Sequence, residues 1–202
     1  MTIRLWLGAV FVSFMVGIAL GIVQCRRMRV VWLSPLCDVM TFVLRGVPFY
    51  VQLLIVYFIL PDLVGINLSP VIAGMLSLGL CSAAYISQIV RGGFDSIVVE
   101  QWEASEVLGF NTFQTLRYVI MPQVLKITVP MIAGECDQIL KSTSVISTIG
   151  VFELTKAGMN IVATEMQVVA AYSLVAVIYL GLSTVLNTVS RLLERRFYYG
   201  TR

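Results

Sequence analysis

The chain has 202 residues, of which 58% are hydrophobic and only 12% are charged, and its mean hydropathy is +0.91. A soluble domain usually carries about twice that share of charged residues, so the composition argues against a water-soluble protein and indicates one solvated by lipid. The net charge of +3 gives no indication of nucleic-acid binding, and the absence of histidine excludes histidine-based catalysis and most zinc sites.

Five apolar segments are long enough to cross a membrane as helices. The first contains no charge between Leu5 and Val23, and it exceeds the apolar core of a signal peptide, so we expect it to be retained as a span. The third begins at Ser69-Pro70, a favourable helix cap followed by a favourable first residue. The expected spans are about 4–24, 39–60, 69–90, 126–146 and 167–187.

Basic residues are distributed unevenly over the connections between these spans. Because cytoplasmic loops of membrane proteins are enriched in arginine and lysine, the pattern predicts an external N-terminus and a cytoplasmic C-terminus. The predicted cytoplasmic side carries Arg26, Arg27, Arg29, Arg91, Arg117, Lys126, Arg191, Arg195, Arg196 and Arg202, and the opposite side carries only Arg4 and Lys156.

The four cysteines are interpreted as small apolar core residues, with a disulfide or redox role as the alternative. They form no C-x-x-C pair, and their intervals match no metal-binding pattern, so we expect neither a metal site nor a catalytic site. They are Cys25, Cys37, Cys81 and Cys136.

Residues 91–125 interrupt the apolar pattern with several carboxylates, which are costly in hydrocarbon, and therefore predict a cytoplasmic excursion. Residues 101–108 form a short amphipathic helix in this interpretation, with Ala104, Val107 and Leu108 on one stripe. Such a stripe indicates a docking surface for a partner, although packing against the chain's own helix ends is equally compatible with the pattern.

Several residues in the second half of this excursion predict where its helices stop and start. Gly109 allows a left-handed stop after the short helix. Asn111 or Thr112 then caps a second helix, which we expect Pro122 to limit.

The same loop resembles the E-A-A-x3-G-x9-I-x-L-P motif of ABC importer permeases. Glu103-Ala104-Ser105, Gly109 and Ile120-Met121-Pro122 match its spacing, with serine replacing the second alanine and methionine replacing the leucine. In that family the segment is the coupling helix, which docks on a cytoplasmic ATP-binding subunit. The resemblance implies that this contact is made by Trp102, Glu103, Ala104, Val107, Leu108, Gly109, Phe110 and Pro122.

Two further stretches are similar to those of polar amino-acid permeases of the histidine, glutamine and arginine subfamily. Residues 45–53 resemble R-G-T-P-x-x-V-Q-L, and residues 140–155 resemble L-K-D-[ST]-S followed by G-x-x-E-L-T. Permeases of methionine importers share the five spans and the coupling motif but lack these stretches.

The fourth span contains charged residues at its centre, each of which needs a partner or a water-filled path. Asp137 and Lys141 are four residues apart and are interpreted as a structural ion pair. Glu135, Gln138 and Ser142 share a second helix face, which we interpret as lining a substrate pathway where the carboxylate meets the ammonium of an amino acid. The alternative for Glu135 is an ion pair with a basic residue of another span.

Glu135 also matches an acid of the subfamily pattern, whereas Ser142 replaces its aspartate. The loss of that second anion favours glutamine-like substrates over arginine or lysine.

Together the residues and the resemblance predict an all-α polytopic membrane protein with a five-transmembrane-helix ABC importer permease core, formed by residues 1–202 as one domain. The resemblance implies a bacterial inner-membrane location, transport by alternating access, and three kinds of partner: a cytoplasmic ATP-binding subunit, a second permease copy or homologue, and an external solute-binding protein. No G-x-x-x-x-G-K-[ST] motif is present, so the chain is not expected to be an enzyme or to hold a cofactor, and ATP and magnesium belong to the partner.

The alternatives are a permease for methionine or another small solute, a membrane assembly protein without a transport role, and an intramembrane enzyme. With no histidine in the chain, the enzyme alternative lacks an obvious catalytic constellation.

Overall fold

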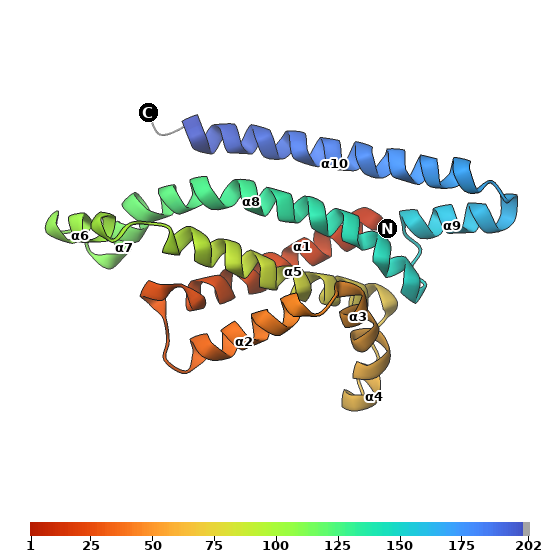
Figure 1. Cartoon of the computed structure of the whole chain (residues 1–202), viewed down its shortest axis with the longest axis horizontal. Helices are drawn as coiled ribbons and strands as arrows, with labels where there is room; N and C mark the ends of the chain where they lie inside the picture. Colours follow the sequence, from red (N-terminus) through yellow and green to blue (C-terminus); the bar gives the residue numbers. More distant parts are fainter. Residues whose placement is uncertain (200–202) are drawn as a thin grey trace.

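The computed structural model describes the backbone of residues 1–199 and the side chains of residues 1–194, and throughout this part of the chain the regular structure is helical (Figure 1). The predicted all-α class is confirmed. Arg195, Arg196 and Arg202 were predicted to lie on the cytoplasmic side. The side chains of the first two, and all of Arg202, lie outside the described part of the chain. The long helices are α1 (Thr2–Gln24), α5 (Pro70–Asp95), α8 (Met121–Ser142) and α10 (Val168–Tyr199).

Shorter elements connect the long helices. The α-helical ones are α2 (Leu33–Gly46), α3 (Phe49–Leu54), α4 (Leu60–Val64), α6 (Val99–Val107), α7 (Thr112–Gln114) and α9 (Leu154–Glu165). The 3-10 turns η1 (Arg26–Met28) and η4 (Thr143–Ile149) and the π-helical turns η2 (Ile55–Ile59) and η3 (Thr115–Ile120) complete the described chain.

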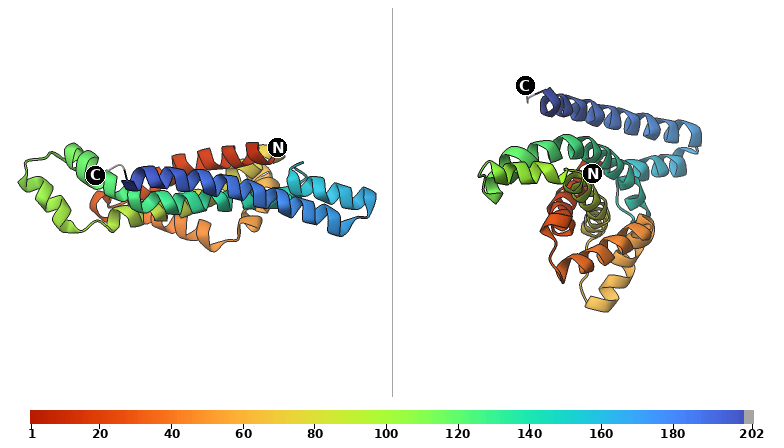
Figure 2. Two further views of the ribbon diagram at one scale, coloured as in Figure 1. Left: turned by 90° about the horizontal axis from the view of Figure 1, so that it is seen from above. Right: turned by 60° about the vertical axis from the view of Figure 1, so that its left-hand side comes forward.

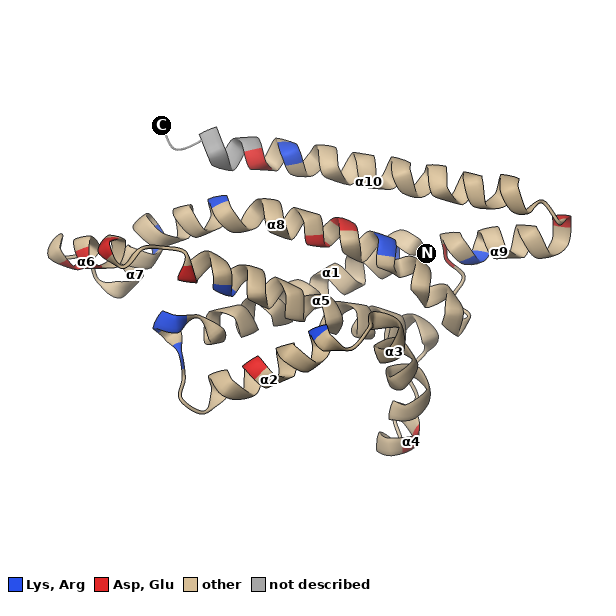
Figure 3. Ribbon diagram, viewed as in Figure 1, with Lys and Arg blue, Asp and Glu red and all other residues tan. Residues whose placement is uncertain are grey.

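Four continuous helical stretches within residues 1–199 are long and apolar enough to cross a membrane, and one bent pair supplies a fifth candidate. The continuous stretches are Thr2–Gln24, Pro70–Asp95, Thr112–Ile149 and Val168–Glu194. Figure 3 shows that charged residues are sparse along most of their length. The stretch Pro70–Asp95, which is the third predicted span, starts as predicted, because the Ser69 hydroxyl accepts a hydrogen bond from the Ile72 N–H group at 3.4 Å and Pro70 occupies the first helical position.

The second predicted span is not one straight helix. α2 ends at Gly46, and the chain bends by 103° before the segment Phe49–Val64 continues. Val47 is extended (φ −95°, ψ 130°) because a following proline disfavours helical backbone. The span predicted over residues 39–60 is thus bent rather than straight, and Pro48 is the reason.

The prediction that Pro122 limits the second helix of the cytoplasmic loop was also wrong. The helix runs from Thr112 to Ile149, with Pro122 in the first turn of α8. The π-helical turn Thr115–Ile120 immediately precedes this proline and shifts the backbone pairing by one residue, and proline itself has no N–H group to pair. The loop is thus joined to the fourth span without a break.

α1 and α5 form the centre of the molecule and approach each other closely. A Cβ atom at Gly17 would lie 2.8 Å from the Ala83 carbonyl oxygen, and one at Gly21 would lie 2.7 Å from the Ser87 carbonyl oxygen. Only glycine allows such backbone contact, which is a common way for membrane helices to associate. α8 packs beside this pair, and α10 lies outside α8, on the side away from α2 to α4 (Figure 2).

The cysteines occupy the positions expected of apolar filler. All four are free, and Cys25, Cys37 and Cys81 are buried.

Candidate functional site

One face of the short helix α6 packs against the rest of the chain, and the opposite face is exposed. Trp102, which is 7% exposed, and Ser105 are buried, whereas Ala104, Val107 and Leu108 are exposed, with Val107 at 87%. The two interpretations of this helix therefore apply to different faces: one packs against the chain itself, and the other remains available to a partner.

Trp102 belongs to an apolar cluster with Ile97 and Ile120 and lies beneath the guanidinium group of Arg27, 4.8 Å from the ring centroid. Its side chain therefore positions α6. The exposed carboxylate of Glu103 lies on the open side. Phe110 is half-buried and lines a hollow of about 230 Å³ together with Trp102.

The end of α6 has the geometry that glycine permits. Gly109 has φ +77°, in the left-handed region that side chains with a Cβ atom adopt rarely. The Phe110 N–H group donates to the Ser105 carbonyl oxygen at 3.0 Å and closes the helix. Asn111 then starts α7, accepting from the Gln114 N–H group at 2.9 Å while Gln114 accepts from the Asn111 N–H group at 2.9 Å.

Asp137 and Lys141 of α8 contact each other, with 2.6 Å between Lys141 Nζ and Asp137 Oδ2. Asp137 is buried, and its Oδ1 atom has no hydrogen-bond partner among the described residues. This pair occupies a different side of α8 from the Glu135 carboxylate.

Glu135 is half-buried on α8, and the hydroxyl group of Ser82 on α5 lies beside its carboxylate. Within the side chains described, no lysine or arginine lies at ion-pair distance from it. The described side chains thus supply no cation for the alternative in which Glu135 forms a structural ion pair. Gln138 is exposed and Ser142 is half-buried, so part of this face is open on the single chain.

Two residues of the recognised stretches have roles that sequence reasoning missed. The Gln52 side chain donates to the carbonyl oxygens of Leu44 at 2.7 Å and Val47 at 2.8 Å, across the bend at Pro48. These carbonyls lack helical partners because the helix stops there. The sequence contained one signal for this role, a glutamine placed four residues after the proline that interrupts the span.

Glu153 is the second such residue, and it is only 2% exposed. Its carboxylate accepts hydrogen bonds from the Thr155 N–H group at 2.9 Å, the Lys156 N–H group at 2.7 Å and the Tyr179 hydroxyl group at 3.0 Å. It therefore caps α9 and ties that helix to α10. Its placement directly before Leu154-Thr155 was compatible with a cap, but the partner on α10 lies 26 residues away.

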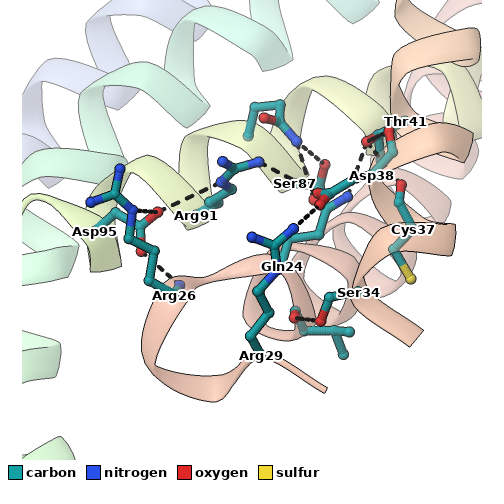
Figure 4. A network of polar contacts seen from close by, with 12 residues as sticks. Gln24, Arg26, Arg29, Ser34, Cys37, Asp38, Thr41, Ser87, Arg91 and Asp95 are labelled. Carbon is teal, nitrogen blue, oxygen red and sulfur yellow. Dashed lines mark hydrogen bonds and ion pairs between the residues drawn. The ribbon is translucent and has the colours of Figure 1, made fainter. Parts of the chain in front are cut away.

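A polar network joins α1, α2 and α5 at the end of the molecule that carries α6 (Figures 1 and 4). Asp38 contacts Arg29 at 2.5 Å and Arg91 at 3.4 Å, and Arg91 also contacts Asp95 at 3.6 Å. Nearby, the buried Gln24 accepts from Gln88 at 3.1 Å and donates to Thr41 at 3.0 Å.

Sequence comparison adds the observation that decides the family. Residues 13–199 match the family described as "Binding-protein-dependent transport system inner membrane component". The chain belongs to this family. Its members are inner-membrane subunits of ABC importers, which work with a separate ATP-binding subunit and a solute-binding protein.

Curated relatives of this permease carry amino-acid transport names. It is 37% identical over 155 residues to the glutamine transport system permease protein GlnP of Escherichia coli (strain K12), covering 76% of this chain and 71% of that protein. It is 33% identical over 189 residues to the probable amino-acid ABC transporter permease protein YckA of Bacillus subtilis (strain 168), covering 93% and 83%. The resemblance to amino-acid ABC importer permeases is thereby confirmed.

Solved structures agree in fold. An amino acid ABC transporter crystallised with histidines superposes with a TM-score of 0.88 at 29% identity, covering 97% of this chain and 90% of that one. The MetNI methionine ABC transporter in an inward-facing form superposes with a TM-score of 0.80 at 18% identity, covering 97% and 92%, which shows a shared fold alone. This protein is thus a multi-pass membrane permease of an amino-acid ABC importer.

Proposed function

We propose that the permease passes glutamine-like amino acids in preference to arginine or lysine, by ATP-driven alternating access, and that Glu135 contacts the substrate ammonium. The observation that carries the proposal is the Glu135 carboxylate, which lies in the middle of a membrane helix and has no cationic partner among the described side chains. A charge in that position is costly unless a ligand or water compensates it, and every amino acid brings an ammonium group.

The neighbours of Glu135 suit a neutral polar side chain better than a second cation. Gln138 and Ser142 offer donors and acceptors without charge, and Ser82 adds a hydroxyl group from α5. Asp137, the other acid of α8, is engaged by Lys141. The name of the 37% identical glutamine permease supports this preference, while an arginine permease of Bacillus subtilis (strain 168) is 28% identical over 196 residues.

The open face of α6 is the proposed docking surface for the ATP-binding subunit. Its exposed part consists of Glu103, Ala104, Val107, Leu108 and Gly109, and Trp102 and Phe110 support it from behind. Because the helix from Thr112 to Ile149 carries both Pro122 and Glu135, a displacement of the loop reaches the pathway through continuous backbone.

The remaining assignments complete this proposal. Residues 1–202 act as one membrane domain, with the N-terminus outside and the C-terminus in the cytoplasm. Two permease copies, or this chain and a homologue, enclose the pathway, because the Gln138 face is open on a single chain.

The test is ATP-driven uptake of labelled glutamine into vesicles holding the permease, its ATP-binding subunit and its binding protein, with unlabelled arginine or methionine as competitor. We expect unlabelled glutamine to compete and the other two to compete weakly. Strong competition by arginine would overturn the preference, strong competition by methionine would favour the alternative importer class, and no ATP-dependent uptake of any amino acid would overturn the transport proposal.

A further inference from the structure

The loop that joins α1 to α2 exposes a run of large apolar side chains directly after a membrane-crossing helix. Val31 is 78% exposed and Trp32 is 87% exposed, and Val30 and Leu33 beside them are also exposed. Leaving such side chains in water forgoes the free energy of burying them. Tryptophan in this position is typical of the boundary between hydrocarbon and headgroups, where its ring is apolar and its N–H group stays hydrated.

Arginines immediately precede this apolar run. Arg26, Arg27 and Arg29 all lie within six residues of Trp32, and the Arg26 side chain is 85% exposed. The Arg26 backbone N–H group donates to Asp95 Oδ1 at 2.9 Å, while its guanidinium group is 3.9 Å from the same carboxylate. The backbone of Arg26 is therefore held in place beside Asp95, while its side chain remains largely exposed.

The ion pairs of this region leave positive charge uncompensated. Four arginines share three carboxylates: Arg26 and Arg91 meet Asp95, Arg29 and Arg91 meet Asp38, and Arg27 meets Glu106. Within this set one positive charge is in excess, and Arg26 has the longest ion-pair distance and the most exposed side chain.

A hollow of about 310 Å³ lies next to these arginines. Arg26, Arg27 and the carboxylate of Asp95, which pairs with Arg26 and Arg91, are among the residues that line it, and Phe94, Ile97 and Trp102 are its large apolar residues. Arginines in excess over carboxylates, beside large apolar side chains, match the two parts of a phospholipid, its phosphodiester and its hydrocarbon.

We propose that the α1–α2 loop, residues 25–32, binds anionic phospholipid at the membrane surface, with Arg26 facing the headgroup phosphate and Trp32 seated at the headgroup level. The apolar run selects a membrane as the occupant, because a free phosphate ion offers nothing to Val31 or Trp32. The excess charge selects anionic lipid over zwitterionic lipid. This binding site is separate from the substrate pathway, and the proposal requires no particular substrate.

The test measures tryptophan fluorescence of the permease with its ATP-binding subunit in vesicles of mixed phosphatidylcholine and phosphatidylglycerol. Bromine on the acyl chains of one lipid at a time quenches tryptophans beside that lipid. The difference between wild type and Trp32→Phe isolates Trp32, since Trp6 and Trp102 remain in both. We expect brominated phosphatidylglycerol to quench Trp32 more than brominated phosphatidylcholine at equal content, and added salt to reduce the difference.

Arg26→Gln tests the charge, and Arg4→Gln is its matched control at the opposite end of α1, where the side chain is also exposed. One arginine near an anionic surface corresponds to an effect of about fivefold in lipid affinity, so Arg26→Gln should lower the preference for phosphatidylglycerol by about that factor. Arg4→Gln should leave it unchanged.

Three results would overturn the proposal. Equal quenching by the two brominated lipids would remove the anionic preference, and an undiminished preference in Arg26→Gln would remove the role of that residue. Identical quenching of wild type and Trp32→Phe would place Trp32 outside the bilayer, as expected if another protein covers the loop. None of these results depends on amino-acid uptake, so they are independent of the transport proposal.

Discussion

The side-chain amide of Gln52 donates a hydrogen bond to the carbonyl oxygen of Leu44, 2.7 Å away, across the 103° bend between α2 and the helix that follows. A second bond reaches the Val47 carbonyl oxygen at 2.8 Å. Where a helix stops in an apolar environment, its last carbonyls need partners, because water is not available to hydrate them. The Gln52 side chain thus replaces the backbone N–H donors that these carbonyls would have if the helix continued past Pro48.

Gln52→Leu should destabilise the permease, because the substitution keeps the side-chain size and removes both donors. Each of the two carbonyls left without a partner costs about 1–3 kcal/mol, so we expect a loss of about 2–6 kcal/mol. Unfolding in mixed micelles at increasing denaturing detergent measures this difference. Gln167→Leu, at an exposed position just before α10, is the control and should change stability little. Equal stability of the two variants would contradict the role of Gln52.

Gly109→Val should leave the protein inserted but weaken its association with the ATP-binding subunit. The residue has φ +77°, and the left-handed region costs a side chain with a Cβ atom about 1–2 kcal/mol, so the valine should rearrange the end of α6. Gly92→Val, at a helical glycine with equally open surroundings, is the control. Co-purification of the ATP-binding subunit and ATP-driven uptake are the measurements, and wild-type values for Gly109→Val would argue against docking through this loop.

Glu135→Gln should reduce amino-acid uptake while insertion and ATP-binding-subunit association persist. The substitution keeps the shape and removes the charge, and the loss of a hydrogen bond to a charged group corresponds to about 1.5–3 kcal/mol of weaker substrate interaction. Glu165→Gln, at the exposed end of α9, removes the same charge elsewhere and should transport normally. Uptake kinetics in vesicles measure both, and full activity of Glu135→Gln would exclude this residue from the pathway.

Glu153→Gln should loosen the junction of α9 with α10. The carboxylate accepts three hydrogen bonds, whereas an amide keeps only one acceptor oxygen and places its NH2 group against at least one backbone N–H group that already donates. We expect a loss of about 1.5–3 kcal/mol. Tyr179→Phe removes the partner on α10, and the double variant should lose less than the sum of the single losses by about 0.5 kcal/mol or more. Strictly additive losses would show that the two side chains act independently.

The proposed orientation predicts which introduced cysteines react from outside the cell. A cysteine at Asn67 should react with a membrane-impermeant reagent in intact cells, because the loop before α5 faces outward in this orientation. A cysteine at Arg27 should react only after the membrane is opened. These labels are scored in a variant lacking Cys136, the one native cysteine that is not buried. Labelling of the Arg27 position from outside would reverse the topology.

The features predicted correctly are those set by local chemistry. The start of α5 follows from Ser69-Pro70, and the left-handed Gly109 follows from glycine itself. Hydropathy also found the apolar segments. It did not reveal the bend at Pro48, because a bent segment and a straight one have the same composition.

The continuation of the helix through Pro122 depends on a π-helical turn that has no sequence signature of its own. Contacts between residues far apart in the sequence could likewise not be predicted from the sequence. The contact of Glu153 with Tyr179 requires α9 and α10 to fold back on each other, and the position of Ser82 beside Glu135 requires α5 to lie against α8.

The glycine seam between α1 and α5 restricts how this permease can change shape. At Gly17 and Gly21 the two helices pack backbone against backbone. Sliding one helix along the other would bring side chains against the carbonyl oxygens and would force the helices apart. We therefore expect the two helices to move together as one rigid unit during transport. We expect relative movement to occur where the helices are interrupted, at the bend before Phe49 and at the turn after Ile149.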